Sequence, residues 1–78
     1  MYMQSNLIEH VAIAIRHFRK DLGLSQEELA DKASLDRTYI SGVERGVRNI
    51  TLDSLEQIII ALGINNKVFF DFVTTHKK

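Results

Sequence analysis

The sequence predicts an all-α fold, a compact five-helix domain in which residues 1–78 form a single unit. Three observations lead to this prediction. Proline, the residue that most strongly disrupts a helix interior, is absent from the 78 residues. Apolar residues recur at helical spacing in several segments, and glycines or capping residues separate those segments. No linker, internal repeat or low-complexity stretch divides the chain.

The first predicted helix runs from about Leu7 to Asp21. Asn6 is its expected cap, with Glu9 three residues later to complete a capping box. Gly23 is its expected stop, because glycine adopts the left-handed conformation that commonly follows a helix. Its apolar side is formed by Leu7, Val11, Ile15 and Phe18.

Two short helices follow. Ser25 is expected to cap the second, with Glu28 at the reciprocal position, and this helix continues to about Ala33. Asp36 is the expected cap of the third, which ends before Gly46.

The last two predicted helices are more apolar. The fourth begins at Thr51 and ends before Gly63, and a last helix, capped by Asn66, continues through Val73. The apolar stripe of the fourth consists of Leu52, Leu55, Ile58, Ile59 and Leu62.

The second and third predicted helices have the pattern of a helix-turn-helix DNA reader. Ala30 is small where the two helices cross, a turn is expected at Ala33 and Ser34, and Ile40 and Val43 are apolar anchors. These anchors leave the other side of the third helix, with Arg37, Thr38, Ser41 and Arg45, free to face outward. The pattern therefore predicts double-stranded DNA as the partner.

Arg37, Thr38 and Ser41 are the predicted base-reading residues. Arginine can donate two hydrogen bonds to guanine, and threonine offers a hydroxyl and a methyl group to thymine. Contacts to the DNA backbone or to flanking positions are predicted for Gln26, Tyr39, Arg45, Arg48, Asn49 and Arg19.

Three of these positions have alternatives that the sequence leaves open. Tyr39 either packs in the core or bonds a phosphate through its hydroxyl. Arg19 either contacts phosphate or pairs with Glu44 inside the fold. Gly42 costs about 1 kcal/mol relative to alanine inside a helix, so either it is a tolerated defect or a neighbouring helix or DNA approaches closely.

The formal net charge is zero, but its distribution is uneven. Between positions 37 and 48, three arginines face the single carboxylate of Glu44, an excess of two positive charges. Between positions 50 and 71, three carboxylates face the single amine of Lys67, an excess of two negative charges. One part of the surface can therefore attract DNA while another repels it.

Other function classes lack support. The chain has no cysteine, which excludes a disulfide framework and any zinc site with cysteine ligands. His10 and His17 lie seven residues apart, too far to chelate one ion easily, and no catalytic constellation is recognisable. Neither an enzyme, a metal nor a cofactor is expected. The apolar runs are too short to span a bilayer and Met1-Tyr2-Met3 lacks the features of a secretory signal, so a cytoplasmic location is expected.

The C-terminal helices are expected to form a homodimer. Five large apolar residues occupy six positions near the C-terminus, more than a short terminal helix can bury alone. The predicted interface is Ile60, Val68, Phe69, Phe70, Phe72 and Val73. A two-fold dimer would place two recognition helices about 34 Å apart, one DNA turn. The alternative is that all three of these phenylalanines fill the monomer's own core.

The second predicted helix has an acidic edge formed by Glu27, Glu28 and Asp31. It lies beside the DNA-reading surface, where a transcription activator could touch a basic region of RNA polymerase. Ordinary helix capping and solvation are the alternative explanation.

The run Leu35-Asp36-Arg37-Thr38-Tyr39-Ile40-Ser41-Gly42-Val43-Glu44-Arg45, followed by Arg48-Asn49-Ile50-Thr51 and a short Phe69-Phe70 helix, resembles the controller proteins of bacterial restriction-modification systems. Those belong to the phage-repressor-like helix-turn-helix regulators. The resemblance implies a homodimer that binds an operator upstream of its own gene and of an endonuclease gene, activating at low occupancy and repressing when a second dimer binds. A phage-type repressor and an antitoxin-like protein-interaction module are the alternatives. One departure is Ser34, where many such turns carry glycine.

Overall fold

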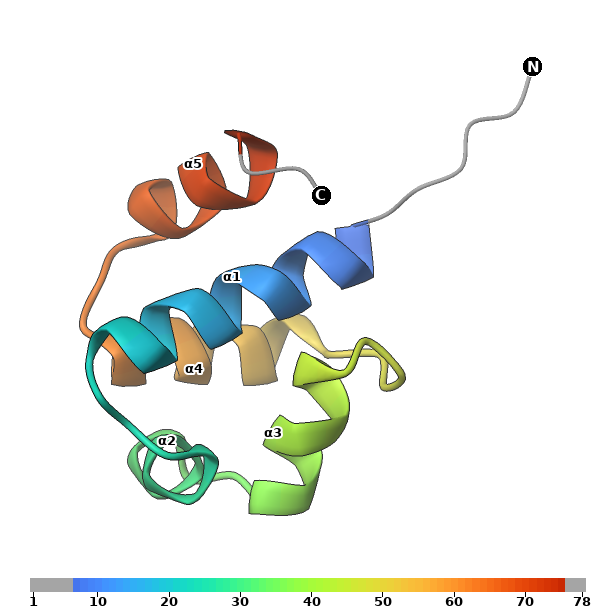
Figure 1. Ribbon diagram of the computed structural model, residues 1–78, viewed down its shortest axis with the longest axis vertical. Coiled ribbons are helices and arrows are strands. Elements are labelled where there is room, and N and C mark those ends of the chain that lie inside the picture. The colour runs from blue at the N-terminus through green and yellow to red at the C-terminus, as the bar shows by residue number, and fades with distance from the viewer. Residues whose placement is uncertain (1–6, 76–78) are drawn as a thin grey trace.

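The computed structural model describes residues 7–75, which form five α-helices and their connections (Figure 1). The helices are α1 (Leu7–Asp21), α2 (Gln26–Ala33), α3 (Arg37–Glu44), α4 (Leu52–Leu62) and α5 (Asn66–Thr75). The range 7–75 contains no strand. The predicted all-α, five-helix fold is confirmed.

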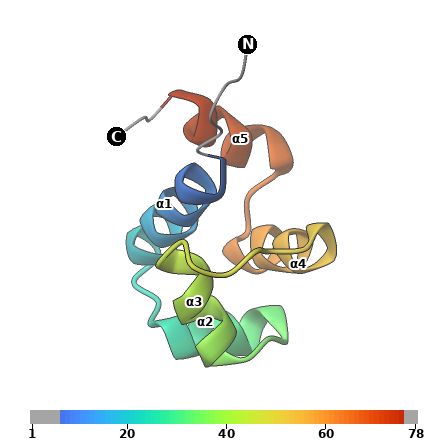
Figure 2. The same cartoon turned by 90° about the vertical axis from the view of Figure 1, so that its right-hand side faces the viewer.

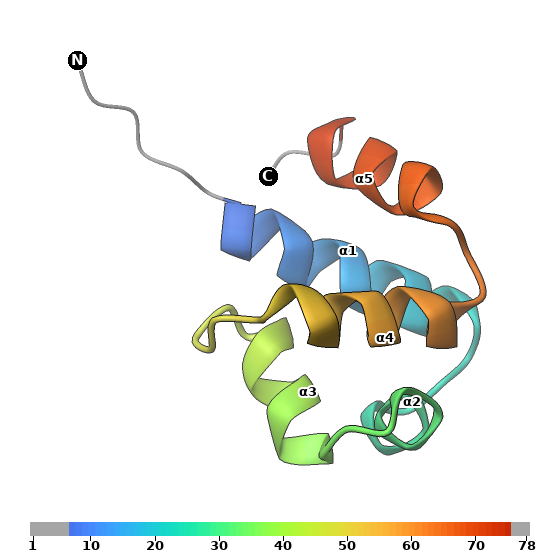
Figure 3. The same ribbon diagram turned by 180° about the vertical axis from the view of Figure 1, so that it is seen from behind.

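The helices are arranged in three levels. α1 and α4 lie in the middle, the pair α2 and α3 packs on one side of them, and α5 lies on the other side, against α1 (Figures 1 and 2). Seen from behind, α4 runs across the front, with α5 above it and α3 and α2 below (Figure 3). The predicted DNA-reading helix and the C-terminal helix are therefore far from each other on the molecule.

One core joins all five helices. Its largest fully buried side chains are one from each helix, in chain order Ile15, Leu29, Ile40, Ile58 and Phe69. Burying an aliphatic or aromatic side chain of this size contributes about 1.5–3 kcal/mol relative to leaving it exposed. Loss of any one helix would therefore open the core that the other four share.

Local capping explains where the helices begin. The Ser25 hydroxyl accepts from the Glu28 N–H at 3.0 Å, and the Glu28 carboxylate accepts from the Ser25 N–H at 2.8 Å, which confirms the predicted capping box. Thr51 caps α4 by accepting from the Ser54 N–H at 3.0 Å. Asp36 occupies the predicted cap position of α3, but its side chain makes no capping hydrogen bond. Asn6, the predicted cap of α1, lies outside the described residues.

The prediction for the last helix was wrong by one residue at its cap. Asn65, not Asn66, caps α5, because the Asn65 Oδ1 accepts from the Val68 N–H at 2.8 Å. The helix also continues two residues beyond the predicted end at Val73, to Thr75. The Thr74 hydroxyl donates to the Phe70 carbonyl at 2.9 Å, which engages a carbonyl of this last turn.

The five helices of residues 7–75 are at most 15 residues long. No single helix there is long and apolar enough to cross a bilayer. α4 and α5 reach the required length and hydropathy only as a pair, and that pair is bent by 104°.

Candidate nucleic-acid interface

The turn between α2 and α3 has the geometry that the sequence pattern requires. Ala30 is buried where the helices meet, and Ser34 ends α2 in the left-handed conformation, with φ 60° and ψ 42°. The Leu35 N–H donates to the Ala30 carbonyl at 2.8 Å, closing the turn. From α4, the Gln57 Nε2 donates to the Ala33 carbonyl at 2.8 Å, which ties the end of α2 to the middle of the molecule.

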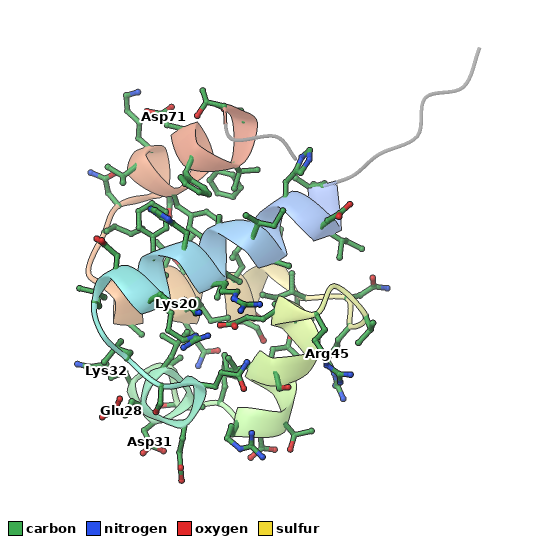
Figure 4. All side chains as sticks on the ribbon, viewed as in Figure 1. Lys20, Glu28, Asp31, Lys32, Arg45 and Asp71 are labelled. Carbon is green, nitrogen blue, oxygen red and sulfur yellow. The ribbon has the colours of Figure 1, made fainter. Side chains whose placement is uncertain are left out.

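The two sides of α3 differ as predicted. Ile40 and Val43 are buried, which confirms them as anchors of the helix. Arg37, Thr38 and Arg45 are exposed, and Ser41 is half-buried beside them. Figure 4 shows Arg45 extending away from the body of the molecule near the end of α3. The structure therefore places the predicted reading residues on an accessible surface.

Glu44, also on α3, is turned inward. Its carboxylate accepts hydrogen bonds from the Arg19 Nε at 2.7 Å and from the Arg19 Nη2 at 2.9 Å. The two residues form a bidentate ion pair between α3 and α1. The Gln26 Nε2 of α2 donates to the same carboxylate at 3.2 Å. The Arg19 Nη1 donates to the Leu24 carbonyl at 2.8 Å, in the connection between α1 and α2.

The prediction of Arg19 as a DNA backbone contact is corrected by this arrangement. The Arg19 side chain is only 10% exposed, and all three of its nitrogens donate inside the fold. The hydrogen bond to Glu44 raises the pKa of the guanidinium above its ordinary value, against the opposing effect of burial. The internal ion pair, one of the two alternatives for this residue, is the one observed.

The loop after α3 folds back on that helix. The Arg48 guanidinium carbon lies 5.2 Å from the centre of the Tyr39 ring, within reach of a cation–π interaction. A Cβ built on Gly42 would lie 3.4 Å from the Arg48 Cβ and 3.6 Å from its Nε. The close neighbour of Gly42 is therefore a side chain of the following loop, not an adjacent helix.

Tyr39 packs against the core, which is the first of its two predicted alternatives. Its ring is half-buried against the core, and its hydroxyl is buried without a hydrogen-bond partner among residues 7–75. An unpaired buried hydroxyl costs about 1–3 kcal/mol. A phosphate contact through this hydroxyl would require Tyr39 or a neighbouring group to move.

A shallow hollow of about 500 Å³ lies where α2 and α3 approach each other. Its lining residues are Arg19, Ser25, Gln26, Glu27 and Arg37. Gln26, predicted to hold the DNA backbone, and Arg37, predicted to read a base, thus border one concave surface. Arg48 and Asn49 lie exposed in the loop at the other end of α3.

The acidic residues of α2 separate into two kinds. The Glu28 carboxylate is engaged by the capping box, so local structure accounts for it. Glu27 and Asp31 are exposed. In Figure 4, the labelled Glu28 and Asp31 lie on the outer side of α2, away from α4.

The predicted dimer interface is only partly available on the surface. The prediction is wrong for Phe69 and Val73, because both are buried in the monomer core against α1. Phe72 is half-buried and stacks on the His17 ring, with 4.3 Å between ring centres. The exposed members of the set are Ile60 at 69%, Val68 at 44% and Phe70 at 37%.

A groove of about 250 Å³ adjoins Phe70 where α4 and α5 diverge. It is lined by Leu52, Asp53, Leu55, Glu56, Ile59, Asn66 and Phe70. Leu52 is 83% exposed, although the sequence placed it in the apolar stripe of α4. The phenylalanines therefore divide between the two predicted alternatives, because Phe69 fills the core and Phe70 reaches the surface.

Metal chemistry has no candidate site among the described residues. Between positions 7 and 75, no group of three or more histidine, aspartate or glutamate side chains is placed to hold an ion. His10 is half-buried and His17 is exposed.

Two features of the interface escaped sequence reasoning. The bond from Gln26 to Glu44 and the contact of Arg48 with Gly42 both join residues from different elements. Helical spacing describes one helix at a time, so it cannot reveal such pairs. The available signals were an acidic residue on a helix intended to face DNA and a glycine inside that helix.

Comparisons with known proteins agree with this geometry. The helix-turn-helix family matches residues 15–65, more than half of the chain. Control protein C.BamHI of Bacillus amyloliquefaciens is 53% identical over 51 residues, which are 65% of this chain and 63% of that protein. Control protein C.SmaI of Serratia marcescens is 47% identical over 60 residues, which are 77% of this chain and 69% of that protein.

Among solved structures, the wild-type restriction-modification controller protein C.Esp1396I is similar over most of both chains. The TM-score is 0.87 at 45% sequence identity, with 91% of this chain and 93% of that chain covered. The same protein as a tetramer with its natural 35 base-pair operator has a TM-score of 0.86. This chain belongs to the helix-turn-helix family, in the group of restriction-modification controller proteins.

Proposed function

We propose that this chain is a sequence-specific DNA-binding transcription regulator that controls its own gene and a restriction endonuclease gene. The single observation that carries the proposal is the orientation of α3. The Glu44 carboxylate is buried, whereas Arg37, Thr38 and Arg45 are exposed, and Arg37 borders the same hollow as Gln26. An outward face of cationic and hydroxyl side chains on a helix-turn-helix suits the major groove of DNA.

Arg37, Thr38 and Ser41 read bases in this proposal, while Gln26, Arg45, Arg48 and Asn49 hold the backbone or flanking positions. Solved variants of C.Esp1396I carry replacements of an arginine, a threonine and a tyrosine that are consecutive in that protein. Arg37, Thr38 and Tyr39 stand in the same order here. A variant of C.Esp1396I with phenylalanine in place of that tyrosine is described bound to its highest affinity operator site, which supports comparing this segment with the corresponding one in an operator-binding protein.

The regulator acts as a homodimer that joins through Ile60, Val68 and Phe70. These three side chains are exposed apolar residues of α4 and α5, at a distance from the reading helix, and Leu52 of α4 is exposed as well. C.Esp1396I is described as a tetramer on its operator, which supports pairing of subunits on DNA. Activation at low occupancy and repression at high occupancy follow if two dimers fill adjacent sites. Such a regulator works in the cytoplasm, beside the DNA it controls.

The proposal is tested by selecting bound sequences from a random double-stranded DNA pool. We expect a pseudo-palindromic sequence with half-sites centred about 34 Å apart, because two subunits read it with two-fold symmetry. That sequence should occur upstream of the protein's own gene and of an endonuclease gene. Enrichment of no sequence, or of a single half-site without symmetry, would contradict the proposal.

A further inference from the structure

We infer that Glu44 is a positioning residue for DNA recognition, which holds the Gln26 amide and the reading helix α3 in one arrangement. This inference rests on the proposed function and assigns a role that Glu44 plays without touching DNA. The position of Glu44 creates an electrostatic conflict. A carboxylate on a helix that approaches phosphates would repel them, yet this one is retained with only 3% of its side chain exposed.

The Glu44 carboxylate lies where three elements meet. Its Oε1 accepts from the Arg19 Nη2 of α1 and from the Gln26 Nε2 of α2, and its Oε2 accepts from the Arg19 Nε. The carboxylate itself belongs to the last residue of α3. One group thus connects the two helices of the DNA-reading unit to each other and to α1.

The consequence for Gln26 concerns the direction of its amide. One Nε2 hydrogen donates to Glu44, which leaves the other hydrogen for a phosphate oxygen. Gln26 is half-buried and is the first residue of α2, where backbone N–H groups also lack partners within the helix. An amide already held in place loses less conformational freedom when it binds than one that rotates freely.

Arg37 borders the same hollow as Gln26, so their separation depends on how α2 and α3 are joined. Backbone contacts set the register of a protein on the duplex, and base contacts depend on that register. Loosening the bond between Glu44 and Gln26 should therefore weaken both kinds of contact.

Charge and positioning make opposite predictions for Glu44→Gln. Removing a negative charge near DNA would by itself strengthen binding to any sequence. Positioning predicts weaker binding, because the NH2 group of the new amide replaces one of the two acceptor oxygens. It then opposes either the Arg19 Nε or the Arg19 Nη2 together with the Gln26 Nε2. The sign of the change separates the two effects.

The test measures binding to the duplex selected by the parent protein and to a scrambled duplex. Glu44→Gln, Gln26→Ala and the double variant are titrated by fluorescence anisotropy, at a temperature where circular dichroism shows each to be folded. We expect each single variant to weaken binding to the selected duplex by about fivefold to tenfold, with little further loss in the double variant. Glu27→Gln, a charge-matched control on α2, should bind both duplexes more tightly. Ile58→Val controls for lost core stability and should bind as the parent does.

Equal or tighter binding of Glu44→Gln to the selected duplex would overturn the inference, and so would fully multiplicative losses in the double variant. A second measurement uses the parent protein alone and so needs no variant to fold. The NMR order parameter of the Gln26 side-chain amide should approach the backbone value of about 0.85, and a value below about 0.6 would overturn the inference. If the parent itself prefers no sequence, the proposed function fails. If the parent prefers one sequence and Glu44→Gln binds that sequence at least as tightly as the parent does, only this inference fails.

Discussion

Arg37 and Thr38 lie exposed at the start of α3, with the anchors Ile40 and Val43 on the other side of the same helix. Because the two groups lie on opposite sides of the helix, the reading side chains can be replaced without changing how the helix packs. It also means that their substitution tests recognition separately from folding.

Arg37→Ala should lose on the order of 1–3 kcal/mol of binding to the selected duplex, because a base-reading arginine makes paired hydrogen bonds that alanine cannot. Binding to scrambled DNA should fall much less. Competition titrations with both duplexes measure the two losses. Arg48→Ala is the matched control, because the loss of a contact to the DNA backbone weakens binding to all sequences about equally. Equal losses for Arg37→Ala on both duplexes would make Arg37 a phosphate contact.

Ser34 is the one non-glycine residue with positive φ among the described residues, and its conformation carries a stability cost. The left-handed region costs a residue with a Cβ about 1–2 kcal/mol, and glycine loses part of that gain through a more flexible unfolded chain. Ser34→Gly should therefore raise the free energy of unfolding by about 0.5–1 kcal/mol, measured by urea denaturation.

Gly63→Ala is the converse experiment. Gly63 has φ 74° and open space around an added Cβ, so the substitution tests backbone conformation without a clash. We expect Gly63→Ala to lower the free energy of unfolding by about 1 kcal/mol.

A destabilised Ser34→Gly variant would contradict the first of these two predictions. It would show that the serine side chain contributes an interaction that outweighs the backbone cost.

At the scale of single elements, the capping box of α2 and the glycine stop of α1 were predictable because both depend on neighbours in the chain. Which side chains of α5 are buried and which are exposed could not be predicted from the sequence. Phe69 and Phe70 are adjacent and chemically identical, and only the direction from which α1 approaches decides which one is buried. The same limit applies to Arg19, whose partner Glu44 is 25 residues away.

The exposed edge of α2 carries a prediction about activation. Glu27 and Asp31 have no capping role, unlike Glu28, so they remain candidates for contact with RNA polymerase. Reversing either charge to lysine should abolish activated transcription in vitro and leave binding to the selected duplex at least as tight. Lys67→Glu on α5 serves as the control. It changes the charge by the same amount in the opposite direction, and it lies far from the DNA-reading unit. Activation that survives both reversals would place the polymerase contact elsewhere.

For the whole molecule, the two adjacent phenylalanines of α5 separate folding from assembly. Phe69→Ala removes a fully buried ring and should cost about 3–5 kcal/mol of unfolding free energy, a large part of the stability of a domain this small. Phe70→Ala should leave the fold intact and shift the protein toward monomer. Denaturation and sedimentation equilibrium at micromolar concentration measure the two effects. A parent that remains monomeric at every concentration, yet binds its operator tightly as one subunit, would defeat the dimer.

The exposure of Arg37 and Thr38 has a consequence for how such regulators diversify. Because neither side chain belongs to the shared core, a library randomised at positions 37 and 38 should consist mostly of folded proteins with altered DNA preference. Surface substitutions of this kind usually change stability by no more than about 0.5 kcal/mol. Two related systems in one cell could thus acquire separate operators through a few codon changes, without any rebuilding of the helical scaffold.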